Sequence, residues 1–235
     1  MCQKLTGIAD RLYLGSMHVA VTEVDEIACL PPVRGFLHTP DQKNGDGLVL
    51  THGAGANCNS KLLNALAAAF AEAGYVVLRC NLPFRQERPH GPPSPAIAER
   101  DRSGLRRAVE FIRARCGGRI FLGGHSYGGR QATILAAEEP EIASALVLFS
   151  YPLHPPRKPL QLRTAHLPNL RTPSFFVHGT RDPFGSLEEM QSALELIPAK
   201  HELLAAEGAG HEILGRKTAE DFILAVVGRF QGFAN

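Results

Sequence analysis

One pentapeptide constrains this chain more than any other feature. Gly124-His125-Ser126-Tyr127-Gly128 follows an apolar run, residues 120–122, and precedes a segment with helical spacing of apolar residues. Strand, sharp turn and helix, with serine at the turn, is the pattern of a nucleophile elbow. A serine in so tight a turn has strained backbone, and side chains two positions away on either side would collide with the strand and helix. The alternative is a glycine-rich turn with a bystander serine, since the pentapeptide alone is common by chance.

The rest of the sequence alternates between short apolar strands and amphipathic helices. Such alternation predicts an α/β fold with a mainly parallel sheet and helices on both faces. Prolines at both ends of the first two strands place them in an outer part of the sheet. We expect strands at 19–24, 33–38, 47–51, 76–80, 120–122, 145–150, 173–179 and 201–204, and helices at 60–74, 97–116, 127–139, 186–196 and 218–230.

Length and composition predict one domain. A chain of 235 residues with 44% hydrophobic residues can bury one large α/β core, which we assign to residues 19–235. Residues 1–18 lack the features of a secretory signal and are expected to be poorly ordered, with Met17 as an alternative start. A formal net charge of +2, without a dense basic cluster, argues against nucleic-acid binding. No run of 18 apolar residues occurs, so no membrane span is expected.

The cysteines indicate the compartment. There are five, scattered along the chain and without a C-x-x-C pair. An odd number at such spacing predicts neither a disulfide framework nor a zinc site, and it fits a reducing cytoplasm.

Three polar residues far apart in the sequence each follow the end of an expected strand. They are Ser126, Asp182 and His211. Parallel sheets place their sites at the carboxyl ends of strands, so we expect the three to meet. A serine hydroxyl needs an imidazole to take its proton, and the imidazole needs a carboxylate to fix its tautomer. Asp182 could instead start a turn, His211 could be a surface histidine, and Glu207 is a less favoured partner from the wrong loop.

A loop of small residues follows the strand at 47–51. In His52-Gly53-Ala54-Gly55 the backbone can approach a substrate oxygen to about 3 Å, which an oxyanion hole requires. We expect the N–H of Tyr127 and that of Ala54 or Gly55 to be the donors, although an ordinary loop is the alternative. His52 is expected to hold the loop in place.

Two proline-rich segments are expected to shape a pocket. Residues 86–95 should form an irregular rim, and Arg85 before them could bind an anionic substrate group, be solvated, or pair with a carboxylate. Residues 151–172 are polar and short, which predicts a small cap or none. No cofactor or metal is expected, because protein groups supply the nucleophile, base and donors.

These motifs together resemble the α/β hydrolases of the dienelactone-hydrolase-like kind. More narrowly, the sequence is similar to the KANL3/Tex30 group of hydrolase-like proteins. The matching segments lie at 52–55, 81–85, 124–130, 178–182 and 210–211. Dienelactone hydrolase itself carries cysteine where Ser126 stands, so its lactone substrate is not carried over.

The resemblance implies a serine hydrolase that cleaves an ester, thioester or related acyl bond of a small molecule through an acyl-enzyme. Its triad order is Ser126, Asp182, His211, as in this sequence. The alternative is a catalytically weak hydrolase-fold interaction protein, since some relatives are subunits of complexes. A peptidase is disfavoured because the chain has no room for a propeller or large lid. The sequence specifies neither the acyl and alcohol groups nor the oligomeric state.

Overall fold

A computed structural model describes residues 18–214 and 219–235 of the chain. Except for His18, the segment 1–18 that we expected to be poorly ordered lies outside the described residues, as does the alternative start Met17. Among the residues described, no helix is long and apolar enough to cross a membrane.

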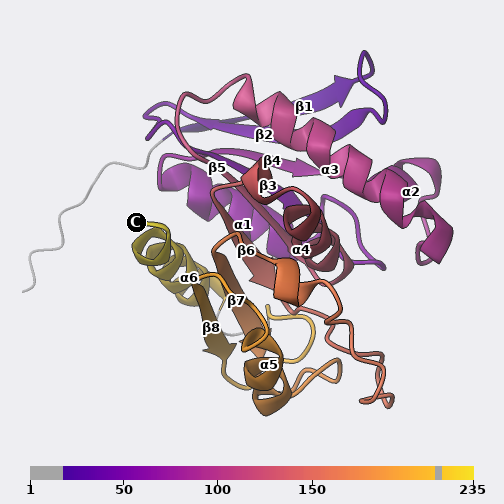
Figure 1. The fold of residues 1–235 in the computed structure, drawn as a ribbon. Helices are drawn as coiled ribbons and strands as arrows, with labels where there is room; N and C mark the ends of the chain where they lie inside the picture. Colours follow the sequence, from indigo (N-terminus) through magenta and orange to yellow (C-terminus); the bar gives the residue numbers. More distant parts are fainter. Residues whose placement is uncertain (1–17, 215–218) are drawn as a thin grey trace, which may run out of the picture.

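Eight strands form one sheet (Figure 1). Their order across the sheet is β1-β2-β4-β3-β5-β6-β7-β8. The pairs β1–β2 and β2–β4 are antiparallel and all other neighbours are parallel. The prediction of a mainly parallel sheet with the first hairpin at its outer part is confirmed. The strands are β1 (Val19–Glu26), β2 (Val33–Pro40), β3 (Gly47–Thr51), β4 (Val76–Cys80), β5 (Ile120–His125), β6 (Ala145–Phe149), β7 (Ser174–Gly179) and β8 (His201–Ala206).

Helices cover both faces of this sheet (Figure 1). One hydrophobic core packs α1 and α6 against the sheet, and the other packs α3, α4 and α5 against the opposite face. The helices are α1 (Lys61–Glu72), α2 (Pro83–Glu87), α3 (Ala98–Arg113), α4 (Tyr127–Glu138), α5 (Leu187–Leu194) and α6 (Ala219–Ala234), with 3-10 turns η1 (Pro95–Ile97), η2 (Pro140–Ile142) and η3 (Leu167–Asn169).

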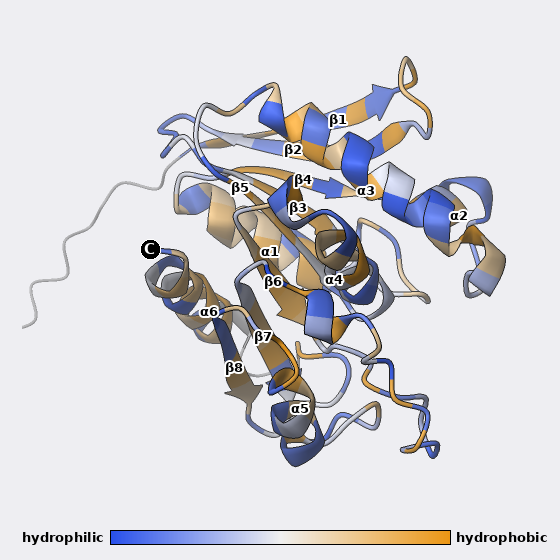
Figure 2. Ribbon diagram, viewed as in Figure 1, coloured by the Kyte–Doolittle hydropathy of each residue, from blue (hydrophilic) through white to orange (hydrophobic). Residues whose placement is uncertain are grey.

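Strand periodicity explains how one run of apolar residues fills two cores. In β3, Leu48 and Leu50 belong to one core and Val49 to the other, because successive side chains point to opposite faces. The central strands are therefore hydrophobic throughout, whereas the helices have one hydrophobic and one hydrophilic side (Figure 2).

The five expected helices all occur, with differences at their ends. Ser60 accepts the N–H of Leu63 at 3.4 Å and so caps α1, and Gly74 follows that helix with φ +94°. Helix α3 lies within the expected range 97–116. It starts at Ala98 because the residues up to Ile97 form the 3-10 turn η1. The short helix α2 was not expected; Pro83 begins it, at the position where proline costs no hydrogen bond.

The chain between β6 and β7 has no α-helix or strand, only η3. The expectation of little or no cap is thus confirmed, and the carboxyl ends of the central strands are left accessible from that side.

Candidate active site

Ser126 lies at the turn between β5 and α4 with φ 51° and ψ −116°. The positive φ is the strain expected of the elbow, and the N–H of Ser126 holds it by donating to the Phe149 carbonyl at 2.8 Å. A Cβ at Gly128 would come within 2.6 Å of the His52 carbonyl oxygen, and one at Gly124 within 2.8 Å of a backbone nitrogen. The steric reason for glycine at both positions is confirmed.

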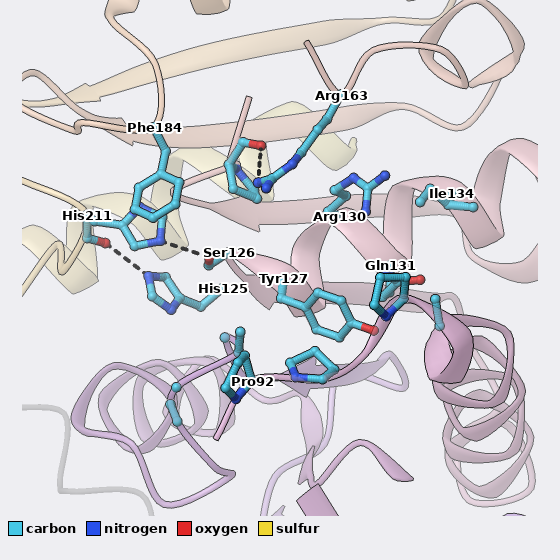
Figure 3. A pocket seen from close by; sticks show the side chains of 18 of the residues that line it. Pro92, His125, Ser126, Tyr127, Arg130, Gln131, Ile134, Arg163, Phe184 and His211 are labelled. Carbon is cyan, nitrogen blue, oxygen red and sulfur yellow. Dashed lines mark hydrogen bonds between the residues drawn. The ribbon is translucent and has the colours of Figure 1, made fainter. Parts of the chain in front are cut away.

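The structure brings the three polar residues together (Figure 3). Nε2 of His211 is 2.8 Å from the hydroxyl oxygen of Ser126. Nδ1 of the same ring is 2.8 and 3.0 Å from the two carboxylate oxygens of Asp182. The Asp182 side chain is fully buried and the His211 side chain is 18% exposed. A carboxylate shielded from water thus contacts an imidazole that the cavity reaches.

Two groups that sequence reasoning did not single out hold the His211 backbone. The Ser150 hydroxyl donates to the His211 carbonyl at 2.8 Å, and Nε2 of His125 donates to the same oxygen at 3.0 Å. Burial lowers the pKa of His125, which keeps its ring neutral. His125 is thus a buried structural residue directly beside His211.

Phe184 contacts both the His211 ring and the Asp182 carboxylate. The Phe184 ring lies against the His211 ring with centroids 4.1 Å apart, and the Phe184 N–H donates to Asp182 Oδ1 at 2.9 Å. Nε2 of His178 donates to the Gly185 carbonyl at 2.8 Å, which closes the loop that carries Asp182. Burial lowers the pKa of His178 as well.

The loop after β3 contacts the same cavity. Ala54 and Gly55 line it together with Tyr127, Ser126 and His211. No hydrogen bond between described residues uses the N–H of Ala54 or Gly55, so these donors are available to a substrate oxygen.

His52 anchors the start of that loop, as expected. Its Nδ1–H donates to the Gly53 carbonyl at 2.8 Å and its Nε2 accepts the Leu82 N–H at 3.2 Å. Burial lowers the pKa of His52 to about 4, so the ring stays neutral at pH 7.

The cavity above Ser126 has a volume of about 690 Å³. Both proline-rich segments contribute to its wall, and for residues 86–95 this matches the expected rim. The cavity-lining residues from the two segments are Pro92, Pro93, Ser94, Pro95, Pro152 and Arg163.

Among the described residues no cluster of three or more histidine, cysteine or acidic side chains could hold a metal ion.

Comparison with known protein families identifies the family of this chain. Residues 44–226 match the family model described as alpha/beta hydrolase domain, which is most of the chain. The chain belongs to the alpha/beta hydrolase family.

Solved structures share the fold of this hydrolase. Dienelactone hydrolase from Anabaena variabilis is 20% identical, with a TM-score of 0.68 over 93% of this chain and 97% of that one. Est1E from Butyrivibrio proteoclasticus is 16% identical, with a TM-score of 0.71 over 91% and 98%. XC6422 from Xanthomonas campestris, described as an α/β serine hydrolase without lid, is 19% identical, with a TM-score of 0.67 over 92% and 93%.

Arg85 of the hydrolase does not occupy the position that the sequence led us to expect. It does not line the cavity, it is buried, and no carboxylate of the described residues pairs with it. Its guanidinium donates to the carbonyls of Ala54 (2.6 Å), Ala56 (2.7 Å), Arg88 (3.1 Å) and Gly91 (3.1 Å). The buried guanidinium therefore joins the loop after β3 to the proline-rich rim.

Asp101 is a further site residue of the hydrolase that sequence reasoning missed. It is fully buried and accepts the Phe84 N–H at 3.0 Å and the Tyr127 hydroxyl at 2.7 Å. Burial raises the pKa of the Asp101 carboxyl, and burial together with Asp101 raises the pKa of Tyr127. The sequence contains a signal for the burial of Asp101, because this residue falls on the apolar face of α3, four residues before Leu105.

Proposed function

We propose that this protein is a serine hydrolase that cleaves an ester, thioester or related acyl bond through an acyl-enzyme. The observation that carries the proposal is the unbroken line of short contacts from the Ser126 hydroxyl through His211 to buried Asp182. The strained backbone of Ser126 supports the same role, since strain of this kind concentrates at functional sites.

In the proposed reaction Ser126 Oγ attacks the acyl carbon while Nε2 of His211 takes its proton. The Nδ1–H of His211 donates to Asp182, so the ring presents an unprotonated Nε2 toward Ser126. The carboxylate then stabilises the imidazolium, which returns the proton to the leaving alcohol or thiol. Water activated by His211 releases the acyl group from Ser126 in the second half of the reaction.

We propose the N–H of Tyr127 and that of Ala54 or Gly55 as donors to the oxyanion. Tyr127 begins α4, where the first N–H groups have no partner within the helix. The loop after β3 lines the cavity beside it. We assign Arg85 an indirect part, which is to hold the carbonyl side of that loop.

Two similarities support this reading. XC6422 is described as a serine hydrolase without lid, and Est1E has been solved with ferulic acid bound. The narrower similarity to the KANL3/Tex30 group rests on the motifs alone. Cys29, Cys58, Cys80 and Cys116 are free thiols, which supports our proposal of a cytoplasmic location.

A fluorophosphonate probe and short p-nitrophenyl esters test the function. The wild-type protein should be labelled at Ser126 and hydrolyse the esters, and Ser126→Ala should lose both. Asp182→Asn should retain the fold and lower kcat by about 10⁴-fold, because the wrong His211 tautomer then faces Ser126.

Ser192→Ala is the matched control, since Ser192 is exposed on α5 and should leave labelling and turnover unchanged. Absence of labelling in the wild type, or full activity in Ser126→Ala, would refute the proposal. Co-purification with a stable partner would then favour the interaction protein.

A further inference from the structure

Three arginines line the same cavity as Ser126, namely Arg102, Arg130 and Arg163. Arg130 lies one turn further along α4, and its N–H donates to the Ser126 carbonyl at 2.9 Å. Residues four apart share a helix face, so the Arg130 side chain extends from the same face as the proposed nucleophile. Figure 3 shows Arg163 beside Arg130, with Ile134 beyond and His211 on the other side of Ser126.

Arg130 lacks an ion pair and has an unsatisfied donor within the part of the chain that the structure describes. Among the described residues no carboxylate forms an ion pair with it, and its buried Nε has no hydrogen-bond partner. The neighbouring Arg102 differs in its charge balance, because Glu99 accepts from its guanidinium and the Glu138 carboxylate lies 3.2 Å from its Nε. Among the described residues that Nε also has no hydrogen-bond partner. A buried donor without an acceptor is rare and calls for an explanation.

The side-chain amide of Gln131, the residue after Arg130, also has an unsatisfied donor. Gln131 is fully buried and lines the cavity, and its Oε1 accepts from Arg102 at 3.3 Å. Because Arg102 can only donate, the amide atom that it contacts is the oxygen of Gln131. The amide nitrogen Nε2 therefore remains as the donor, and it has no partner among the described residues.

Beyond the carboxylates paired with Arg102, no described residue brings a negative charge into contact with these donors. Arg163 donates to the Pro152 carbonyl at 3.1 Å, and burial followed by the nearby Arg130 lowers its pKa. Burial, Arg130 and Arg102 lower the pKa of His166 to about 4, so its ring is neutral. Among the described residues that line the cavity the single carboxylate is Glu212, which is exposed and adjoins His211.

We propose that Arg130, Gln131 and Arg163 bind a carboxylate or phosphate group carried by the acyl substrate. Guanidinium groups hold both anions through paired N–H donors, and the Gln131 amide adds a neutral donor. One helical turn rises about 5.4 Å, so an anion at Arg130 and an acyl carbon at Ser126 fit within one small molecule. The inference rests on the proposed function for the reaction at Ser126, but not for the anion site itself.

Binding can be measured without turnover. The Ser126→Ala protein is titrated calorimetrically with glutarate and, separately, with inorganic phosphate. We expect one of them to bind, which tells carboxylate from phosphate. Arg130→Gln in the same background should weaken that binding about 10- to 100-fold, the loss typical of one charge-assisted hydrogen bond. Arg171→Gln makes the same charge change at an exposed residue outside the cavity and should leave the affinity unchanged.

Arg130→Lys provides a second variant if Arg130→Gln melts at a lower temperature than its parent. It keeps the charge but lacks the planar fork, so its affinity should lie between those of the parent and of Arg130→Gln. Binding of neither anion, or binding that is equal in all Arg130 variants, would overturn the inference.

Turnover gives the second measurement. In the protein with intact Ser126, kcat/KM for mono-p-nitrophenyl glutarate should exceed that for neutral p-nitrophenyl butyrate, and Arg130→Gln should reduce this ratio about 10- to 100-fold. Labelling of Ser126 with no charge preference and no anion binding would refute the anion site alone. Anion binding that depends on Arg130, without any labelling, would refute the proposed function alone.

Discussion

The backbone of Ser126 is strained. Its left-handed φ costs about 1–3 kcal/mol, which only the surrounding contacts can offset. The bond from its N–H to Phe149 and the bond from Arg130 to its carbonyl supply part of this. The close approach of strand, helix and loop that leaves no room for a Cβ at Gly124 or Gly128 also fixes where the hydroxyl lies.

Gly128→Ala therefore tests the sterics of the turn. The new Cβ would lie 2.6 Å from the His52 carbonyl oxygen, so the loop after β3 must shift away from Ser126. We expect a loss of about 1–3 kcal/mol in the free energy of unfolding and a lower kcat, measured by denaturant unfolding and ester hydrolysis. Gly228→Ala in α6, where a Cβ meets nothing within 4 Å, should be neutral or slightly stabilising. Equal effects of both substitutions would contradict the steric account.

At the scale of elements, Asp101 connects three helices. It belongs to α3, accepts the Phe84 N–H of α2, and accepts the hydroxyl of Tyr127, the first residue of α4. The Tyr127 ring in turn packs edge-on against Phe84 with centroids 5.6 Å apart. The carboxylate thus holds α2 and α3 against the start of α4, the helix that begins next to the proposed nucleophile.

Replacing Asp101 should uncouple these helices. Asp101→Ala leaves the Phe84 N–H and the Tyr127 hydroxyl without an acceptor, and we expect it to lower the free energy of unfolding by about 1–3 kcal/mol. Asp101→Asn keeps one acceptor oxygen and should cost less. Chemical denaturation of both variants decides the matter, and an alanine variant as stable as wild type would show that water replaces the carboxylate.

At the scale of the whole molecule, several buried histidines are neutral. Burial lowers the pKa values of His38, His52 and His166 to about 4, and these residues are far apart in the sequence. In the unfolded chain each would titrate near its ordinary pKa of 6.5. The folded protein therefore binds fewer protons than the unfolded protein between these two values.

Stability should consequently fall as the pH decreases from about 6.5 to about 4. For fully buried His52 the shift corresponds to about 3 kcal/mol, present in full above pH 6.5 and lost progressively toward pH 4. Urea unfolding at several pH values in this window measures the slope. His166→Gln should reduce it, whereas replacing exposed His90 with Gln should not. A free energy of unfolding that is independent of pH would contradict the assignment of neutral buried histidines.

Sequence patterns alone determined the strands, most helices and the turn at Ser126. These features depend on local physics: side chains alternate with a period of two in strands and 3.6 in helices, and a tight turn excludes a Cβ at Gly124 and Gly128. The missing cap was also readable, because residues 151–172 are few and rich in proline.

Only the tertiary structure decided what surrounds Ser126. Asp101 meets a backbone group 17 positions away, Arg85 one 31 positions away, and Ser150 one 61 positions away. A buried polar side chain takes whichever partner the packing brings within reach, and no local pattern encodes that partner. The sequence likewise left open whether Arg85 binds a substrate anion, is solvated or pairs with a carboxylate, and only the packing placed it on backbone carbonyls. The arginine beside Ser126 that has an unsatisfied donor is Arg130.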